Sequence, residues 1–420
     1  MTSVDALAGF LDASPSPWHA VSSAAAMLDA EGYIAVDEAA APWTSVPRGY
    51  VIRGGALVAW CGDGSIPGSF RIVGAHTDSP GLRVKPLPDT GKLGWRQLGV
   101  EVYGGALTNS WLDRDLGVAG RLVERNGTAR LVRVDEPVAR VPQLAIHLDR
   151  DVGESGLKLD RQAHLTPVWG TGKFAPGEFA EWIAAMASLE RGALAAWELC
   201  LYDITPAAVL GADRTLFASG RLDNLVSCWA ATTALRSCAQ LDDGTCRVVA
   251  LFDHEEVGSQ SSVGASGPLL ETVLERLVLA AGGGREHLHR AFAASTCISA
   301  DNAHAVHPNY PERHEPDHCP LVNHGPALKL NSNQRYGTSA ETAAVFQRAC
   351  EAAGVPWQVF VSRNNMPCGS TIGPLSATRL GIATVDVGVP QLSMHSAREL
   401  CGADDPLHLQ AALAAYYAGA

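Results

Sequence analysis

The chain has 420 residues, of which 47% are hydrophobic and 18% are charged, as expected for a well-cored globular protein and not for a disordered one. Its 32 basic and 44 acidic residues give a formal net charge of −12, which argues against non-specific nucleic-acid binding and against anionic membrane surfaces. The N-terminal sequence does not predict a secretory signal, and no apolar run approaches the roughly 18 residues of a membrane-spanning helix. Ten cysteines without a CxxC pair predict reduced, mostly buried thiols and a cytoplasmic protein.

The N-terminal part of the sequence predicts two helices followed by strands. Helical patterns cover residues 3–13 and 17–31, and strand-like patterns cover 50–61 and 70–75. The second helix begins favourably, because Ser16 offers a capping hydroxyl and Pro17 suits the first helical position. The strand at 70–75 is apolar apart from Arg71, and His76 follows it directly.

The sequence pattern changes between about residues 86 and 217. Segments 98–107 and 120–134 contain short alternating runs separated by Gly or Asn-Gly, which is typical of antiparallel strands. We therefore predict an inserted β-rich domain. The predicted boundaries are 86–217 for this inserted domain, and 1–85 together with 218–420 for the domain that it interrupts.

Helices and strands alternate after residue 217. Helical patterns cover 222–238, 267–281, 340–353 and 405–418, and strand patterns cover 247–253, 295–300, 356–361 and 382–387. Such alternation favours the α/β class, with a mixed sheet covered by helices.

Five clusters of histidine and carboxylate residues lie at predicted strand ends or sharp turns. Ligands of open α/β sheets collect at the carboxyl ends of the strands, so these side chains are candidates for one site. Most of the signals also have a structural interpretation, since Asp223 could simply cap a helix and a single histidine such as His395 is more often structural. The clusters are GAHTDSP (74–80), SGRLDN (219–224), DHEEVGS (253–259), SADNAH (299–304) and SMHSARE (393–399).

Adjacent glutamates at the end of an apolar strand are the strongest of these signals. Packing the carboxylates of Glu255 and Glu256 together costs free energy unless a cation compensates. One glutamate can bind a metal ion while its neighbour moves a proton. Together the clusters supply His, Asp, Glu, Asp and His plus one further Glu, which suits two metal ions about 3.5–4 Å apart that share a bridging carboxylate, polarise a carbonyl group and lower the pKa of a bridging water. Nitrogen and oxygen ligands without cysteine suit Zn²⁺, Co²⁺ or Mn²⁺.

A second group of histidines follows the fourth cluster. Its density raises the idea of another metal site, but a polar loop is the interpretation that we favour. The group consists of His304, His307, His314, His318 and His324.

Several strings along nearly the whole chain resemble those of the aspartyl aminopeptidases, a branch of the co-catalytic zinc exopeptidases. They occur in the order of that family, and the metal-site strings show no departure from it. The strings are GAHTDSPGLRVKP, SGRLDNL, DHEEVGSQSSVGA, SADNAHAVHPNYPERH, KLNSNQRYGT and SMHSARE.

The resemblance implies roles for residues from all five clusters. His76 and Asp301 would bind one of two zinc ions in each subunit. Glu256 and His395 would bind the other, and Asp223 would bridge them. Glu255 would act as the general base, and Asp78 would orient the first zinc-binding histidine.

The resemblance also implies the substrate and the assembly. Similar enzymes remove an N-terminal Asp or Glu from peptides, and Lys329 matches the position expected to meet the acidic side chain. Tyr336 would donate a hydrogen bond to the developing oxyanion. His147, in the inserted domain, would reach the active site of a neighbouring subunit. The implied assembly is a homo-oligomer, a tetrahedral dodecamer built from dimers.

Other functions fit the sequence less well. The nearest alternatives are a two-zinc aminopeptidase of broader or neutral specificity and an N-acyl amino acid deacylase, which share the metal ligands and differ in the substrate pocket. A non-catalytic assembly protein is disfavoured, because every expected ligand is present. Absence of a basic stripe disfavours a nucleic-acid module, and absence of a dinucleotide glycine fingerprint disfavours a redox enzyme.

Overall fold

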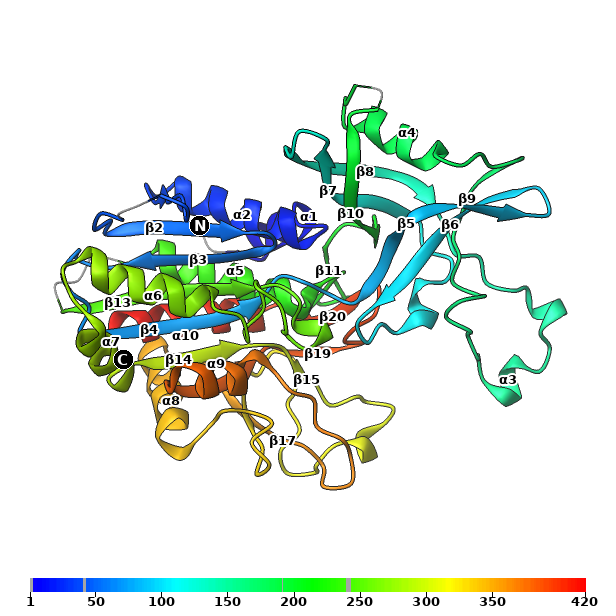
Figure 1. The fold of residues 1–420 in the computed structure, drawn as a ribbon. Coiled ribbons are helices and arrows are strands. Elements are labelled where there is room, and N and C mark those ends of the chain that lie inside the picture. The colour runs from blue at the N-terminus through cyan, green and yellow to red at the C-terminus, as the bar shows by residue number, and fades with distance from the viewer. Residues whose placement is uncertain (1–2, 41–42, 191, 239–242) are drawn as a thin grey trace.

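Strands from both ends of the chain build a nine-stranded mixed sheet at the centre of an α/β body (Figure 1). The structure is a computed structural model and describes residues 3–40, 43–190, 192–238 and 243–420. The strand order is β1 (Ile34–Ala35), β2 (Arg48–Arg53), β3 (Ala56–Cys61), β13 (Thr245–Phe252), β4 (Ser69–His76), β14 (Thr296–Ala300), β18 (Ala383–Gly388), β16 (Ala327–Leu330) and β17 (Gln358–Val361). The central strands β13, β4, β14 and β18 are parallel to one another, so their carboxyl ends meet at one edge.

Helices cover both faces of this sheet, because alternate residues of its strands are apolar on both sides. In β4, Val73 and Ala75 belong to one core cluster, whereas Phe70 and Ile72 belong to the other. The first face packs against α1 (Val4–Asp12), α2 (Pro17–Asp29), α5 (Leu222–Arg236), α8 (Ala340–Ala353) and α10 (Asp405–Ala418). The second face packs against α6 (Leu269–Ala280), α7 (Arg285–Ala293) and α9 (Ile372–Leu380). The α/β class predicted from the sequence, a mixed sheet covered by helices, is confirmed.

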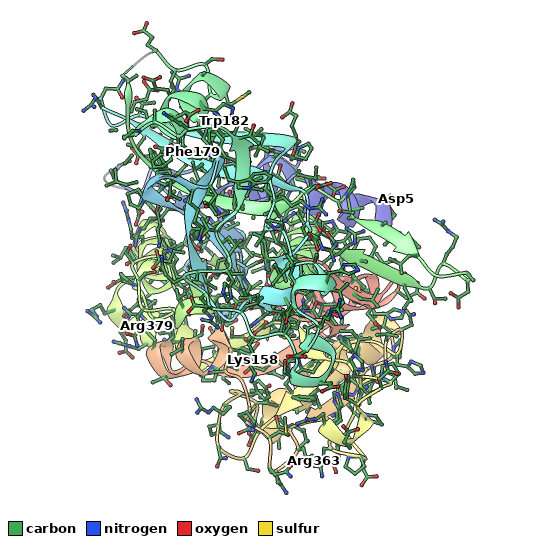
Figure 2. The ribbon with its side chains drawn as sticks, turned by 90° about the vertical axis from the view of Figure 1, so that its right-hand side faces the viewer. Asp5, Lys158, Phe179, Trp182, Arg363 and Arg379 are labelled. Atoms are coloured by element: carbon green, nitrogen blue, oxygen red, sulfur yellow. The ribbon has the colours of Figure 1, made fainter. Side chains whose placement is uncertain are left out.

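A second, antiparallel sheet of six strands projects from the body (Figure 1). Its order is β8 (Ala129–Ala139), β7 (Leu116–Glu124), β10 (Leu194–Asp203), β5 (Gly81–Lys92), β6 (Trp95–Tyr103) and β9 (Val168–Thr171). Helix α4 (Glu178–Met186) packs on it through Phe179, whose ring lies 5.6 Å from that of Trp182 and 5.9 Å from that of Trp197. This sheet therefore has a hydrophobic core of its own. Figure 2 shows Phe179 and Trp182 at the opposite end of the molecule from Arg363.

A small third sheet lies beside the carboxyl edge of the central strands. It contains β11 (Ala208–Leu210), β12 (Leu216–Ser219), β20 (Glu399–Gly402), β19 (Pro390–Leu392) and β15 (Ala303–His304). Gly388 lets β18 approach the loop after β14, because a Cβ atom there would lie 1.9 Å from the carbonyl oxygen of Asp301. None of the helices in the described parts of the chain is long and apolar enough to cross a membrane.

Candidate metal centre

The carboxyl ends of three neighbouring parallel strands place four of the predicted site residues together. His76 is the last residue of β4. Asp301 directly follows β14, the strand that pairs with β4. Glu255 and Glu256 lie in a short 3₁₀ helix, Glu255–Val257, just beyond β13 on the other side of β4. The topology of the sheet therefore gathers segments that are far apart in the sequence.

Asp223 and His395 approach the same edge from outside the central sheet. Asp223 lies at the start of α5 but has non-helical dihedral angles (φ −83°, ψ 105°). The backbone therefore departs from the helix at this residue. His395 lies between β19 and β20 with φ 68°, in the left-handed region that non-glycine residues seldom adopt. A non-glycine residue in this region is often found at a functional site.

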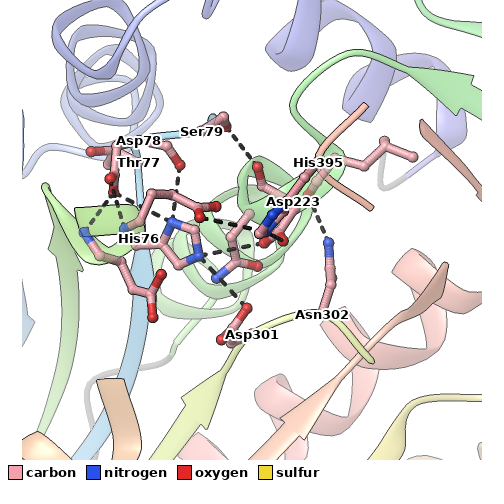
Figure 3. A network of polar contacts seen from close by, with 12 residues as sticks. His76, Thr77, Asp78, Ser79, Asp223, Asp301, Asn302 and His395 are labelled. Carbon is pink, nitrogen blue, oxygen red and sulfur yellow. Dashed lines mark hydrogen bonds and ion pairs between the residues drawn. The ribbon is translucent and has the colours of Figure 1, made fainter. Parts of the chain in front are cut away.

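Distances within the cluster show that Asp223 lies between the two histidines (Figure 3). Its Oδ1 is 3.4 Å from Nε2 of His76, and its Oδ2 is 3.4 Å from Nε2 of His395. Nε2 of His76 also lies 3.6 Å from Oδ1 of Asp301, and Nε2 of His395 lies 3.4 Å from Oε2 of Glu256. Three overlapping groups thus have the spacing of metal ligands: His76 with Asp223 and Asp301, Asp223 with Glu256 and His395, and His76 with Glu255 and Glu256.

Asp78 holds three residues of the cluster in place through hydrogen bonds. It is fully buried, and its two carboxylate oxygens accept hydrogen bonds from the backbone N–H groups of Glu255 (3.0 Å) and Glu256 (3.1 Å). Its backbone carbonyl oxygen lies 3.0 Å from Nδ1 of His76, which leaves Nε2 of that ring facing the cluster. The hydroxyl of Tyr103, in the projecting sheet, also donates to Asp78 (2.7 Å). The projecting sheet therefore contributes to the site.

Glu399 has an equivalent role on the opposite side, and the sequence did not reveal it. Its buried carboxylate accepts the backbone N–H of Asp223 (2.9 Å) and the backbone N–H of His395 (2.7 Å). It therefore ties the start of α5 to the β19–β20 turn. A signal was present in the sequence, since Glu399 begins the apolar strand segment ELCG. Tyr103 was missed as well, and its position within an ordinary β segment gave no sign of a contact with Asp78.

Charge accumulates in this cluster because carboxylates outnumber histidines. Burial raises the pKa of Glu255 to about 7, and neighbouring carboxylates such as Asp301 contribute in the same direction. Burial also raises the pKa of Glu256 well above its ordinary value, with Asp223 next in effect. Burial opposes protonation of His76, but the surrounding carboxylates outweigh it and raise the pKa of that ring. In the polypeptide alone, the site therefore has a surplus of negative charge that a cation would neutralise.

A pocket of about 290 Å³ opens beside the cluster. Its wall includes Tyr336, which is 4% exposed and packs on Phe360, and Met394, the neighbour of His395. Lys329 is buried next to this wall, with Nζ 5.0 Å from the centre of the Tyr336 ring. The Lys329 ammonium group donates to the backbone carbonyls of Asp301 (2.8 Å) and Asn302 (3.1 Å). It therefore brings positive charge to both the metal cluster and the pocket.

The remaining predicted residues lie elsewhere. His147 is exposed, in the 3₁₀ helix Ile146–Leu148 of a segment that extends away from the body with α3 (Val152–Ser155) (Figure 1). His304, His307 and His314 line the pocket, and the His314 ring accepts the backbone N–H of His307 (3.2 Å). His318 lies 2.6 Å from Glu315.

Comparisons with known proteins show the family of the chain. Residues 10–417 match the family described as aminopeptidase I zinc metalloprotease (M18). The chain is 57% identical over 418 residues to a "Probable M18 family aminopeptidase 2" of Streptomyces coelicolor, covering 98% of this chain and 96% of the relative. It is 50% identical over 420 residues to the protein of the same name in Mycobacterium leprae, covering 98% and 97%.

Solved structures of the same kind have the same fold. One is a chain in the cryo-EM structure of the Ape4 and Nbr1 complex, with a TM-score of 0.93, 34% identity, and coverage of 99% of this chain and 85% of that one. Another is the mApe1 dodecamer of S. cerevisiae, with a TM-score of 0.87, 27% identity, and coverage of 99% and 96%. The chain belongs to the M18 family of zinc-dependent aminopeptidases.

Proposed function

We propose that this aminopeptidase removes N-terminal Asp and Glu residues from peptides and holds two zinc ions in each subunit. The observation that carries the metal part is the position of Asp223, whose two oxygens each lie 3.4 Å from a different histidine. A carboxylate placed between two histidines suits a ligand shared by two cations.

The donor set fits zinc. All five residues offer nitrogen or oxygen atoms, which zinc accepts, as do Co²⁺ and Mn²⁺. Two buried carboxylate oxygens, Oδ1 of Asp223 and Oε1 of Glu256, have no hydrogen-bond partner within the described residues. Such oxygens are costly to bury unless a cation lies against them. His76, Asp223 and Asp301 would hold one ion, and Asp223, Glu256 and His395 the other.

When bound, the two ions would supply Lewis-acid polarisation of the scissile carbonyl and activation of water. Glu255 is placed beside these ligands and has a pKa near neutrality, which suits a group that takes a proton and returns it to the leaving amine. Asp78 keeps His76 in the orientation that the site needs. The Tyr336 hydroxyl stays protonated because burial raises its pKa, so it can donate to a developing oxyanion.

The preference for acidic residues is assigned to Lys329. Its ammonium group has three N–H donors, and two of them are used by backbone carbonyls. Its Nζ also lies 3.8 Å from Oδ2 of Asp301, a carboxylate that a bound metal ion would neutralise, which would leave the positive charge of Lys329 for the substrate. A buried cation beside the pocket would favour an acidic substrate side chain despite the net negative charge of the protein. Replacement of Lys329 by Met keeps the volume and removes the charge, so the ratio of kcat/KM for Asp over Ala substrates should fall by 10-fold or more.

We also propose a homo-oligomer, a tetrahedral dodecamer built from dimers, in which His147 acts in a neighbouring subunit. The similar mApe1 structure is a dodecamer. His147 is exposed, in the segment that extends away from the body with α3, which suits a contact with another subunit (Figure 1).

A panel of chromogenic amides tests the proposed substrate. Hydrolysis of Asp-, Glu-, Leu- and Ala-linked amides is measured with zinc-loaded protein, before and after chelation. We expect chelator-sensitive cleavage confined to Asp and Glu. Cleavage of Leu or Ala at similar rates would overturn the acidic preference and leave a neutral aminopeptidase. Activity only on N-acyl amino acids would indicate a deacylase.

A further inference from the structure

A small cavity lies where the α/β body meets the projecting sheet. Its volume is about 40 Å³, and its wall combines the residues before α2 with the start of β5 and the end of β10. A single water needs roughly 10–15 Å³ by this measure, so the cavity has room for a group of three or four heavy atoms. Nothing in the proposed reaction uses it.

Two arginines line this cavity, and neither has a carboxylate partner among the described residues. The guanidinium group of Arg83 lies against the rings of Tyr103 (4.1 Å) and Trp18 (5.4 Å), and within the described residues it has no hydrogen bond and no ion pair. Among the described residues, the hydrogen bonds of Arg221 go to the backbone carbonyls of Ser14 (3.1 Å) and Leu11 (3.4 Å), and its guanidinium group lies 5.6 Å from the centre of the Tyr202 ring. Both guanidinium groups stay charged in proteins, so this wall is positive.

The two carboxylates of the wall are already engaged. Asp203 lies 3.2 Å from Arg114 and accepts the backbone N–H (2.9 Å) and the hydroxyl (2.7 Å) of Thr205. Glu399 accepts the two backbone N–H groups described above. Asp78 and Asp253 act on Arg83 through space, but across the described residues neither forms an ion pair with it. Asp203 and Asp12 act on Arg221 through space in the same way. Neither arginine of the wall therefore has a direct counter-ion in the parts of the chain that the structure describes.

A helix terminus adds to this charge. Helix α2 has 13 residues and begins at Pro17, and Ser16 and Pro17 both line the cavity. The N-terminal end of a helix carries partial positive charge, which favours an anion.

We propose that the cavity binds a small planar oxyanion, of the size of formate or bicarbonate, between Arg83 and Arg221. The planar guanidinium fork matches the geometry of such an anion, and the volume exceeds that of a single atom or water. Three residues of the wall are close in sequence to the metal cluster: Thr77 next to His76, Arg221 two residues before Asp223, and Ser396 next to His395. Bound anion would therefore hold together segments that carry metal-site residues from three parts of the chain.

Thermal unfolding of the zinc-loaded protein tests this site without any activity assay. Melting is compared in formate, bicarbonate and chloride at equal ionic strength and pH. We expect formate or bicarbonate to raise Tm by about 2 °C or more relative to chloride. Equal Tm values in all three salts would overturn the proposal.

Two matched variants locate the effect. Arg83→Met should abolish the difference between the salts. Arg276→Met should keep it, because Arg276 also stacks on an aromatic ring, that of Trp43 at 3.9 Å, but lies outside the cavity wall. An oxyanion effect that persists in Arg83→Met would place binding elsewhere.

A crystal structure of the unmodified protein grown in formate decides the matter if Arg83→Met does not fold. Density for a planar anion in contact with Arg83 and Arg221 would support the proposal. Water molecules alone, or a halide when bromide is supplied in competition, would overturn it.

Discussion

Neighbouring glutamates in one short 3₁₀ helix meet different surroundings. Oε2 of Glu256 lies 3.4 Å from Nε2 of His395, and its buried Oε1 has no hydrogen-bond partner among the described residues, as expected of a metal ligand. The carboxylate of Glu255 lies within 4.8 Å of the His76 ring nitrogen and of the Glu256 carboxylate, and burial raises its pKa to about 7. Both backbone N–H groups are fixed by the same carboxylate, that of Asp78. One residue can therefore hold the metal while the other moves a proton.

Replacement of Glu255 by Gln should separate these two roles. The amide keeps the shape but cannot take a proton, so kcat should fall by about 10²- to 10⁴-fold while zinc content stays unchanged. Steady-state kinetics and metal analysis measure both. The matched variant Glu256→Gln should lose zinc. Zinc loss from Glu255→Gln would contradict the role proposed for that residue.

The lowered pKa of His19 should make the free energy of unfolding depend on pH, independently of the metal cluster. Burial lowers its pKa from 6.5 to about 4, and Arg133 acts in the same direction. Between these values the unfolded chain binds a proton that the folded chain does not, so the free energy of unfolding falls as the pH decreases from about 6.5 to 4. The contribution of His19 is fully retained above pH 6.5 and amounts to about 3 kcal/mol over the whole interval.

Urea unfolding of the metal-free protein at pH 7 and pH 5 measures this contribution. Wild type should lose about 2 kcal/mol more than His19→Gln between the two pH values. Equal losses in the two proteins would show that His19 titrates normally in the folded state.

The sequence allowed us to predict which residues gather at the candidate site, but not most of the contacts between them. The sequence indicated the His, Asp and Glu residues that follow buried strands, and the structure brings His76, Asp223, Glu256, Asp301 and His395 together. The positioning residues Tyr103 and Glu399 were not predicted. Glu399 at the start of an apolar strand was a signal, but the partners of both residues come from distant elements. Only the folded topology creates such contacts.

At the level of elements, the strongly periodic segments were predicted well and the irregular ones were not. The predicted strand 70–75 corresponds to β4, and the predicted helix 340–353 coincides with α8, which has a Ser339 cap. Helix α9 was not predicted, because Gly373 and Pro374 disfavour a helix interior. Both are in its first turn, where proline is tolerated, and a Cβ atom at position 373 would lie 2.2 Å from Asp386.

The link between α5 and the β19–β20 turn depends on Glu399. Replacement by Gln leaves one good acceptor for two backbone N–H groups and sets an amide N–H against the other. We expect a loss of about 2–3 kcal/mol in the free energy of unfolding and weaker zinc binding. The control Glu271→Gln breaks a surface ion pair with Arg379 and should cost less than about 1 kcal/mol. Urea unfolding and zinc competition measure both variants, and equal effects would contradict a linking role for Glu399.

Across the whole molecule, the projecting sheet is attached to the site and also carries exposed apolar residues. Tyr103 connects it to Asp78. Leu93 (93% exposed), in the turn between β5 and β6, and Ile146 (57%) and Leu148 (75%), in the segment between β8 and β9, are exposed. Exposed apolar residues in one part of a chain suit contacts between subunits. The sequence resemblance implied such an assembly, but no periodic pattern in a single chain specifies which surface meets which.

Mixing two inactive variants tests whether His147 works across a subunit boundary. His147→Ala and Glu255→Gln are each expected to be inactive alone. Mixed oligomers should regain activity, because a subunit with intact Glu255 can receive His147 from a Glu255→Gln neighbour. Absence of recovery in oligomers shown by mass to be mixed would place His147 outside the neighbouring site.

The metal centre is most directly tested by the zinc content per chain at equilibrium. Elemental analysis after dialysis against buffered zinc should give two ions per chain for wild type and fewer than one for Asp223→Ala, because Asp223 lies between both histidines. One ion or none in wild type, or two ions retained in Asp223→Ala, would contradict a two-zinc centre shared through Asp223.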